Sequence, residues 1–145
     1  MTVLLLIPGM GPAWAAPAIS VSNAGSVLEG DLGDVPGHQL VFTVTLSAPS
    51  TTPVTVHYRV YPSSLSGNLT LEDNYLAVTA APIVFAPGDT SEQFTVDIVA
   101  DNVAEDDLVV IANIYDASGA TLPDTDCSGV AYGATERCGT IVDDD

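Results

Sequence analysis

The chain has 145 residues, and its 19 acidic residues against two basic ones produce a formal net charge of −17. It contains no lysine, and its two basic residues are Arg59 and Arg137. Nucleic acid and anionic lipid surfaces need clustered Lys and Arg, so this balance excludes both as partners. Because 47% of the residues are hydrophobic and only 14% are charged, the chain can bury a core rather than remain disordered. Its length suits a single domain.

The first residues have the pattern of a secretory signal. Residues 3–7 are apolar, Pro8-Gly9 interrupts them, and residues 13–15 form an A-x-A cleavage pattern, although no basic residue precedes the apolar run. The apolar stretch is shorter than the roughly 20 residues that a membrane-spanning helix needs, so no membrane insertion is expected. We therefore expect residues 1–16 to be a signal peptide, residues 17–145 to form one domain, and the protein to be secreted or held at the cell surface. A disordered apolar leader is the alternative.

From residue 19 onward, apolar and polar side chains alternate with a period of two, which is typical of β-strands with one buried face. In chain order the expected strands are residues 19–21, with a continuation through 26–28, then 40–46, 54–61, 94–98, 108–115 and 139–142. Residues 108–115 are apolar on both faces, which predicts a central strand. Proline- and glycine-containing turns separate the strands. Six to eight strands at this spacing predict an all-β, antiparallel, immunoglobulin-like β-sandwich.

The outward face of the strand at residues 54–61 carries His57 and Arg59 beside Thr55 and Tyr61. No Ser or Cys nucleophile motif with a histidine partner is visible, so His57 is interpreted as a solvated strand residue rather than a catalytic one. The acidic residues lie on short loops instead of along a cleft. The sequence therefore predicts a protein that is not an enzyme.

Cys127 and Cys138 flank a loop-like stretch just before the last expected strand. In an oxidising compartment, a disulfide bond that closes this loop is the natural interpretation. Two free thiols are the alternative. A zinc site is disfavoured because two cysteines without nearby histidines make a poor ligand set.

Acidic residues gather where strands are expected to end. Glu29 follows the first strand, Asp101 and residues 105–107 occupy the connection before residue 108, and residues 143–145 follow the last strand. Loops that are distant in sequence meet at one pole of a sandwich, and converging carboxylates need a counter-cation. An all-oxygen ligand set on flexible loops favours Ca²⁺ over Mg²⁺. The alternative is that the acidic residues are solvated and only keep the protein soluble.

These residues also resemble the Calx-β domain, a calcium-binding β-sandwich module of sodium–calcium exchangers, integrins and bacterial surface proteins. Five motifs occur in the family's order. They are Val27-Leu28-Glu29-Gly30, Phe42-Thr43-Val44-Thr45-Leu46-Ser47, Val84-Phe85-Ala86-Pro87-Gly88-Asp89-Thr90, Asp101-Asn102-Val103-Ala104-Glu105 and Thr140-Ile141-Val142-Asp143-Asp144-Asp145. The resemblance runs from about Ile19 to Asp145 and implies a seven-stranded antiparallel sandwich that holds Ca²⁺ in the loops at one pole.

The resemblance also implies a ligand set. It comprises the carboxylates of Glu29, Asp101, Glu105, Asp143, Asp144 and Asp145 and the backbone carbonyl of Val103. Two positions depart from the family pattern. Asn74 stands where a ligating Asp is expected, so Asp73 would serve only after a shift of one residue, and Leu108 replaces the family's second Glu.

The function implied is that of a non-catalytic calcium-binding module in an adhesion, matrix or spacer role, with calcium ions and other surface or matrix proteins as partners. A purely structural sandwich with no significant metal binding is the alternative.

Overall fold

The computed structural model describes residues 15–30, 38–63, 81–100, 102, 104, 106–122 and 136–143. These residues form eight β-strands and no helix. The strands are β1 (Ile19–Val21), β2 (Gly25–Leu28), β3 (Gln39–Leu46), β4 (Val54–Pro62), β5 (Ala81–Phe85), β6 (Ser91–Asp97), β7 (Leu108–Ser118) and β8 (Glu136–Val142). None of the described residues belongs to a helix that could cross a membrane.

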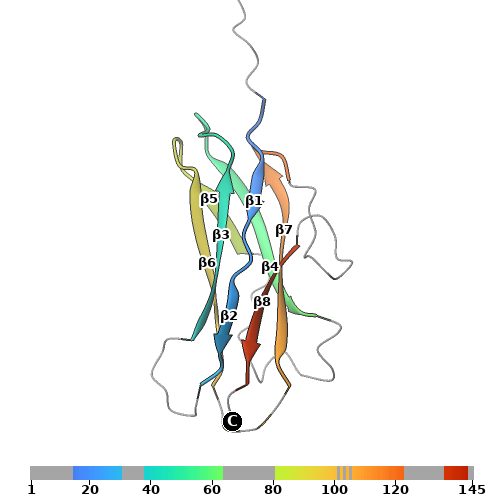
Figure 1. The fold of residues 1–145 in the computed structure, drawn as a ribbon. Coiled ribbons are helices and arrows are strands. Elements are labelled where there is room, and N and C mark those ends of the chain that lie inside the picture. Colours follow the sequence, from blue (N-terminus) through green and yellow to red (C-terminus); the bar gives the residue numbers. More distant parts are fainter. Residues whose placement is uncertain are drawn as a thin grey trace, which may run out of the picture.

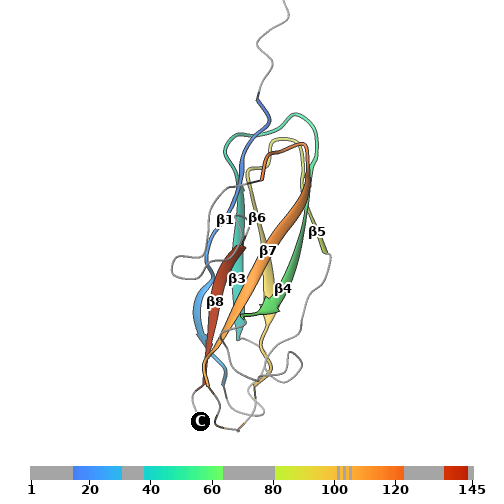
Figure 2. The ribbon, with the colours of Figure 1, turned by 90° about the vertical axis from the view of Figure 1, so that its right-hand side faces the viewer.

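The strands form two sheets that pack face to face as an elongated sandwich (Figures 1 and 2). One sheet has the strand order β1-β3-β6, and the other has the order β2-β8-β7-β4-β5. The predicted all-β sandwich is thereby confirmed. We call the end at which β2 and β8 finish and β7 begins the acidic pole, which lies at the bottom of Figure 1. The other end, at which β1 begins and β7 finishes, is the opposite pole.

The core lies between the sheets, because alternate side chains of each strand point inward. In β3, Leu40, Phe42, Val44 and Leu46 are buried while the residues between them are more exposed, as the period of two predicts. The rings of Phe42 and Phe94 stack at 5.0 Å across β3 and β6. Tyr58, on the facing sheet, stacks on Phe94 at 4.0 Å, so aromatic contact joins the two layers. Burial raises the pKa of the Tyr58 hydroxyl.

The N-terminal segment changes sheets and therefore contributes two of the eight strands among the described residues. β1 pairs with β3, and after the short link of residues 22–24 the chain continues as β2 beside β8. Backbone bonds mark the crossing, because Ser22 N donates to Thr43 O in one sheet and Ala24 N donates to Cys138 O in the other. The β2–β8 pair is parallel, and so is the isolated bridge between Ala18 and Thr121, so the expectation of a wholly antiparallel sandwich holds for the other described strand pairs only.

β7 is the central strand of the larger sheet, as its two apolar faces predicted. Val110 and Ala112 are buried toward the core, and Ile111 is buried on the other face. Near its end, β7 contains a β-bulge. Thr55 pairs with Ser118 but His57 pairs with Tyr115, so β7 has one more residue than β4 between these pairs. Asp116 lies in this bulge with a φ of 51°, a left-handed conformation that Asp tolerates better than most residues.

The close approach of the sheets near β8 depends on Gly139. A Cβ at this position would lie 2.9 Å from both Leu40 Cδ atoms and 3.2 Å from Ala24 Cβ. Leu40 is itself fully buried, so its side chain has little room to move.

We therefore expect Gly139→Ala to destabilise the fold by roughly 1–3 kcal/mol through overpacking. Thermal or urea unfolding measures the effect. Thr140→Ala is the control, because Thr140 neighbours Gly139 on the other face of β8, and this change should have a smaller effect. An unchanged unfolding midpoint for Gly139→Ala would contradict the tight packing of β8 on β3.

Candidate functional site

Two of the eight predicted ligands, Glu29 and Asp143, lie within the described part of the chain. The other six lie outside the described residues: Asp73, Asp101, Val103, Glu105, Asp144 and Asp145. Glu29 follows β2 directly, and Asp143 follows β8 directly. Both residues therefore stand at the acidic pole (Figure 1).

The strand register makes these two residues neighbours. Leu28 is the partner of Val142 in the parallel β2–β8 pair, so Glu29 and Asp143 each stand one residue beyond it. On the other side of β8, Leu108 is the partner of Ile141 in the antiparallel β7–β8 pair. Asp107, which directly precedes β7, therefore reaches the same edge. Three adjacent strands each contribute one acidic residue to this pole.

Hydrogen bonds hold these strand ends together. Glu29 N donates to Val142 O at 2.9 Å, which extends the β2–β8 ladder by one residue. Asp143 N donates to Asp107 Oδ1 at 3.3 Å. The carboxylate that directly precedes β7 therefore positions the chain that leaves β8. Asp107 was absent from the predicted ligand set. The signal that could have found it is its place immediately before a strand antiparallel to β8, which puts it beside the residues that follow β8.

Among the acidic residues that the structure describes, Glu29 is the buried one, with only 5% of its surface exposed. Its backbone oxygen lies 2.6 Å from His38 Nδ1. Because a carbonyl oxygen only accepts, Nδ1 of His38 carries the proton and donates this bond. Gly30 follows with a φ of 86°, a conformation that glycine adopts without strain and that turns the chain away from the strand. Glu29 is thus held by backbone bonds on both sides.

This arrangement offers only oxygen atoms from carboxylates and backbone carbonyls, which are the donors that hard cations such as Ca²⁺ prefer. A buried ionised carboxylate is costly unless a positive charge or hydrogen-bond donors compensate it. No group of three or more His, Cys, Asp or Glu side chains within the described residues is arranged to hold a metal ion. The donor chemistry fits Ca²⁺, while the described residues alone do not form a cage.

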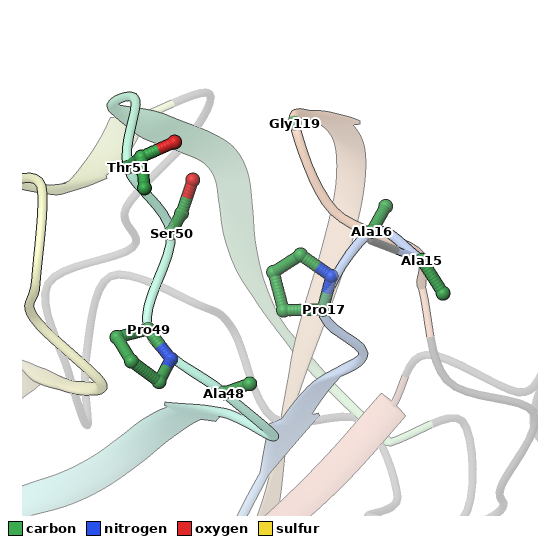
Figure 3. Close-up of a pocket in the computed structure, with 8 residues that line it drawn as sticks. All are labelled: Ala15, Ala16, Pro17, Ala48, Pro49, Ser50, Thr51 and Gly119. Atoms are coloured by element: carbon green, nitrogen blue, oxygen red, sulfur yellow. The ribbon is translucent and has the colours of Figure 1, made fainter. Parts of the chain in front are cut away.

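A cavity of about 440 Å³ lies at the opposite pole (Figure 3). Its lining is small and uncharged and comes from the residues before β1, the loop after β3 and the residue after β7: Ala15, Ala16, Pro17, Ala48, Pro49, Ser50, Thr51 and Gly119. No carboxylate lines it, so this cavity is no candidate for the cation.

Cys138 lies in β8, and Cys127 lies outside the described residues, so their bond stays a prediction. No cysteine in the described part of the chain is free.

No known family profile matches the sequence, and no curated protein matches it either. Solved structures do match. The apo form of the Calx CBD1 domain is 18% identical, with a TM-score of 0.63, over 88% of this chain and 98% of that chain. The Calx CBD2 domain is 13% identical, with a TM-score of 0.62, over 91% of this chain and 90% of that chain. The calcium binding domain CBD12 of CALX1.1 is 18% identical, with a TM-score of 0.59, over 83% of this chain and 42% of that chain.

The protein is therefore a β-sandwich domain with the fold of the Calx-β domains, and the resemblance predicted from the five motifs is confirmed at the level of the fold.

The burial of Glu29 leads to a prediction for the metal-free protein. Glu29→Gln keeps the shape of the side chain but removes a buried negative charge beside Asp107 and Asp143. In EDTA, we expect this variant to be more stable than the parent by roughly 1–2 kcal/mol, measured by thermal unfolding.

The control is Asp89→Asn, which removes one charge from an exposed turn between β5 and β6 at the opposite pole. Its effect should stay within about 0.5 kcal/mol. A loss of stability in Glu29→Gln would show that the ionised carboxylate is already compensated within the metal-free protein.

Proposed function

We propose that this domain is a non-catalytic calcium-binding module. The observation that supports the proposal most strongly is the position of Glu29, Asp107 and Asp143 at the ends of three adjacent strands, with Glu29 buried. The chain has no lysine to neutralise such a group. The fold is shared with the calcium binding domain CBD12 of CALX1.1, which agrees with this function.

In this proposal Glu29, Asp107 and Asp143 supply carboxylate oxygens from the described residues. The connection before β7 adds Asp101, Glu105 and the carbonyl of Val103, and Asp144 and Asp145 extend the set beyond Asp143. Bound Ca²⁺ would supply positive charge that neutralises these carboxylates and ties the ends of β2, β7 and β8 to one another. Its effect on the protein is therefore mechanical: the acidic pole becomes stiffer and the fold more stable.

We further propose that the domain works outside the cytoplasm, as the leader pattern in residues 1–16 suggests, in a secreted or cell-surface protein. Extracellular calcium modules bind with dissociation constants on the order of 10⁻⁴–10⁻³ M, so weak sites suffice there. A domain that stiffens when it binds calcium suits a role in adhesion, in a matrix or as a spacer, with other surface or matrix proteins as partners.

A second candidate function is a purely structural sandwich whose acidic residues are solvated. The exposure of Asp106 and Asp107 to solvent favours it. The two candidates differ in one measurable property, which is the response of folding stability to calcium.

We expect the midpoint of thermal unfolding to rise with calcium concentration. A ligand present at 100 times its dissociation constant stabilises a folded protein by about 2.7 kcal/mol. Glu29→Gln and Asp107→Asn should lose most of this response, whereas Asp89→Asn at the opposite pole should keep it. Mg²⁺ should stabilise less, because it requires strict octahedral geometry and retains its waters. An identical midpoint with and without calcium, together with no heat of binding, would favour the structural candidate.

We also propose that a disulfide bond joins Cys127 to Cys138. The closed loop has about ten residues between the cysteines, so the bond should stabilise the fold by roughly 3 kcal/mol on the chain-entropy estimate. We expect a reducing agent to lower the unfolding midpoint of the parent protein and to leave the double variant Cys127→Ser, Cys138→Ser unchanged. Two titratable thiols in the native, non-reduced protein would contradict the bond.

A further inference from the structure

The outward face of β4 and β7 carries an ordered set of aromatic and polar side chains, which we call the Arg59 face. It comprises His57, Arg59 and Tyr61 on β4, Asn113 and Tyr115 on β7. His57 is the cross-strand partner of Tyr115, and Arg59 is the partner of Asn113. The two strands lie side by side in the middle of the larger sheet (Figure 1). All five side chains lie on the face away from the core, because the residues between them are the inward ones.

Arg59 is held in place by its neighbours. Its Nε donates to Asn113 Oδ1 at 3.1 Å. Its Cζ atom lies 5.6 Å from the ring centroid of Tyr61 and 5.6 Å from that of Tyr115, which is within cation–π distance of both rings. Asn113 is only 6% exposed, so the acceptor that orients the guanidinium is itself fixed. A guanidinium that is already ordered loses less side-chain entropy when it binds a ligand.

Arg59 is exposed, and it forms no ion pair with the described residues, although the chain has 19 acidic side chains. Only Nε of Arg59 donates to Asn113, so the N–H groups of its two Nη atoms can donate to a ligand. Two parallel N–H donors of this kind match a planar carboxylate. The chain thus presents one prepared anion-binding group on a surface that is otherwise strongly negative.

The surroundings of Arg59 are suited to a ring-shaped ligand. His57 stacks on Tyr115 at 5.9 Å, and its Nδ1 lies 3.7 Å from Asp116 Oδ2. The adjacent edge strand β5 adds Pro82 beside His57, and Val84, which is 53% exposed, beside Thr55. Flat aromatic and apolar surfaces of this kind pack against the C–H face of a sugar ring, while the exposed carboxylate of Asp116 offers a partner for its hydroxyls.

We propose that the Arg59 face binds a carboxylated sugar, a uronate, with its carboxylate on the guanidinium of Arg59 and its ring against the aromatic side chains. This inference goes beyond the calcium function and does not depend on it, because the Arg59 face contains none of the proposed ligands of the acidic pole.

Charge selects this ligand among other anions. A nucleic acid, or a second copy of a chain that carries a net charge of −17, brings many negative charges and is repelled over the whole surface. A single uronate carries one charge, and the trimer used in the test carries three. Exposed charges more than about 8 Å away are largely screened at physiological ionic strength, so the charges that this small ligand experiences are mainly those of Arg59 and the nearby Asp116.

The test is a titration of the folded full chain, in EDTA, with a galacturonate trimer and with its methyl ester as the uncharged analogue. Calorimetry measures affinity, and amide chemical shifts locate the contact. We expect the trimer to shift amides around residues 55–61 and 113–118, and the methyl ester to bind at least tenfold more weakly. Arg59→Gln should weaken binding of the trimer by about tenfold or more. Arg59→Lys, which keeps the charge but loses the planar donor pair, should lose a large part of the affinity.

Arg137→Gln is the matched control, because it removes the same charge from β8 and should change the affinity less than twofold. Glu29→Gln should bind the trimer as the parent does, which separates this result from that of the calcium proposal. The inference is overturned if the trimer does not bind, if the ester binds equally well, or if Arg137→Gln loses as much affinity as Arg59→Gln. Self-association that depends on Arg59 would instead identify a second copy of the chain as the ligand and would also overturn it.

Discussion

The pairing of the N-terminal segment with both sheets is the constraint on which the rest of the structure depends. β1 is bonded to β3, and only a few residues later β2 is bonded to β8 in the facing sheet. One continuous stretch of backbone therefore connects the two layers along their length. The parallel register of β2 and β8 also determines that Glu29 stands beside the end of β8. Without this crossing, Glu29 would follow an edge strand of the smaller sheet, away from Asp107 and Asp143.

The charge balance of the chain sets the second constraint. A protein with 19 acidic and two basic residues cannot neutralise its carboxylates internally. On exposed turns this matters little, because water and salt screen such charges. At the acidic pole the situation differs, since Glu29 is buried and Asp107 is engaged with the backbone after β8. The fold thus places acidic residues together at one end of a chain that has few basic ones, which is the physical basis of the calcium proposal.

The sequence predicted the strands with a strong alternating pattern, because a side-chain period of two records directly which face is buried. β3, β4 and β6 are of this kind, whereas the burial of both faces of β7 was visible from the apolar residues at successive positions of its sequence. β5 was harder to foresee because it has only five residues and contains Pro82, which suits an edge strand. The change of sheet after Val21 does not alter the alternation of apolar and polar residues, so the sequence does not reveal it. It depends on contacts with β3 and β8, which are distant in sequence.

As with the fold, the sequence predicted part of the candidate site. Carboxylates at strand ends were plain in the sequence, but their grouping depends on strand order and register. Asp107 illustrates this limit. It was visible as one acidic residue among several in a connection, and its bond to the backbone of Asp143 follows only from the antiparallel pairing of β7 and β8. The burial of Glu29 likewise follows from its place beside Val142. Val142 is distant in the sequence, so the residues around Glu29 do not indicate that it is buried.

β7 links the two proposed functional surfaces and also keeps them independent. Asp107 precedes it at the acidic pole, while Asn113 and Tyr115 lie further along it on the Arg59 face. Because the strand between them is buried on both faces, its close packing holds Asn113 and Tyr115 in place. The acidic pole and the Arg59 face also have opposite electrostatic requirements. In the calcium proposal the acidic pole takes up an added positive charge, whereas Arg59 already supplies the positive charge of its face. Calcium should therefore act on the stability of the domain while the sugar surface remains formed in either state.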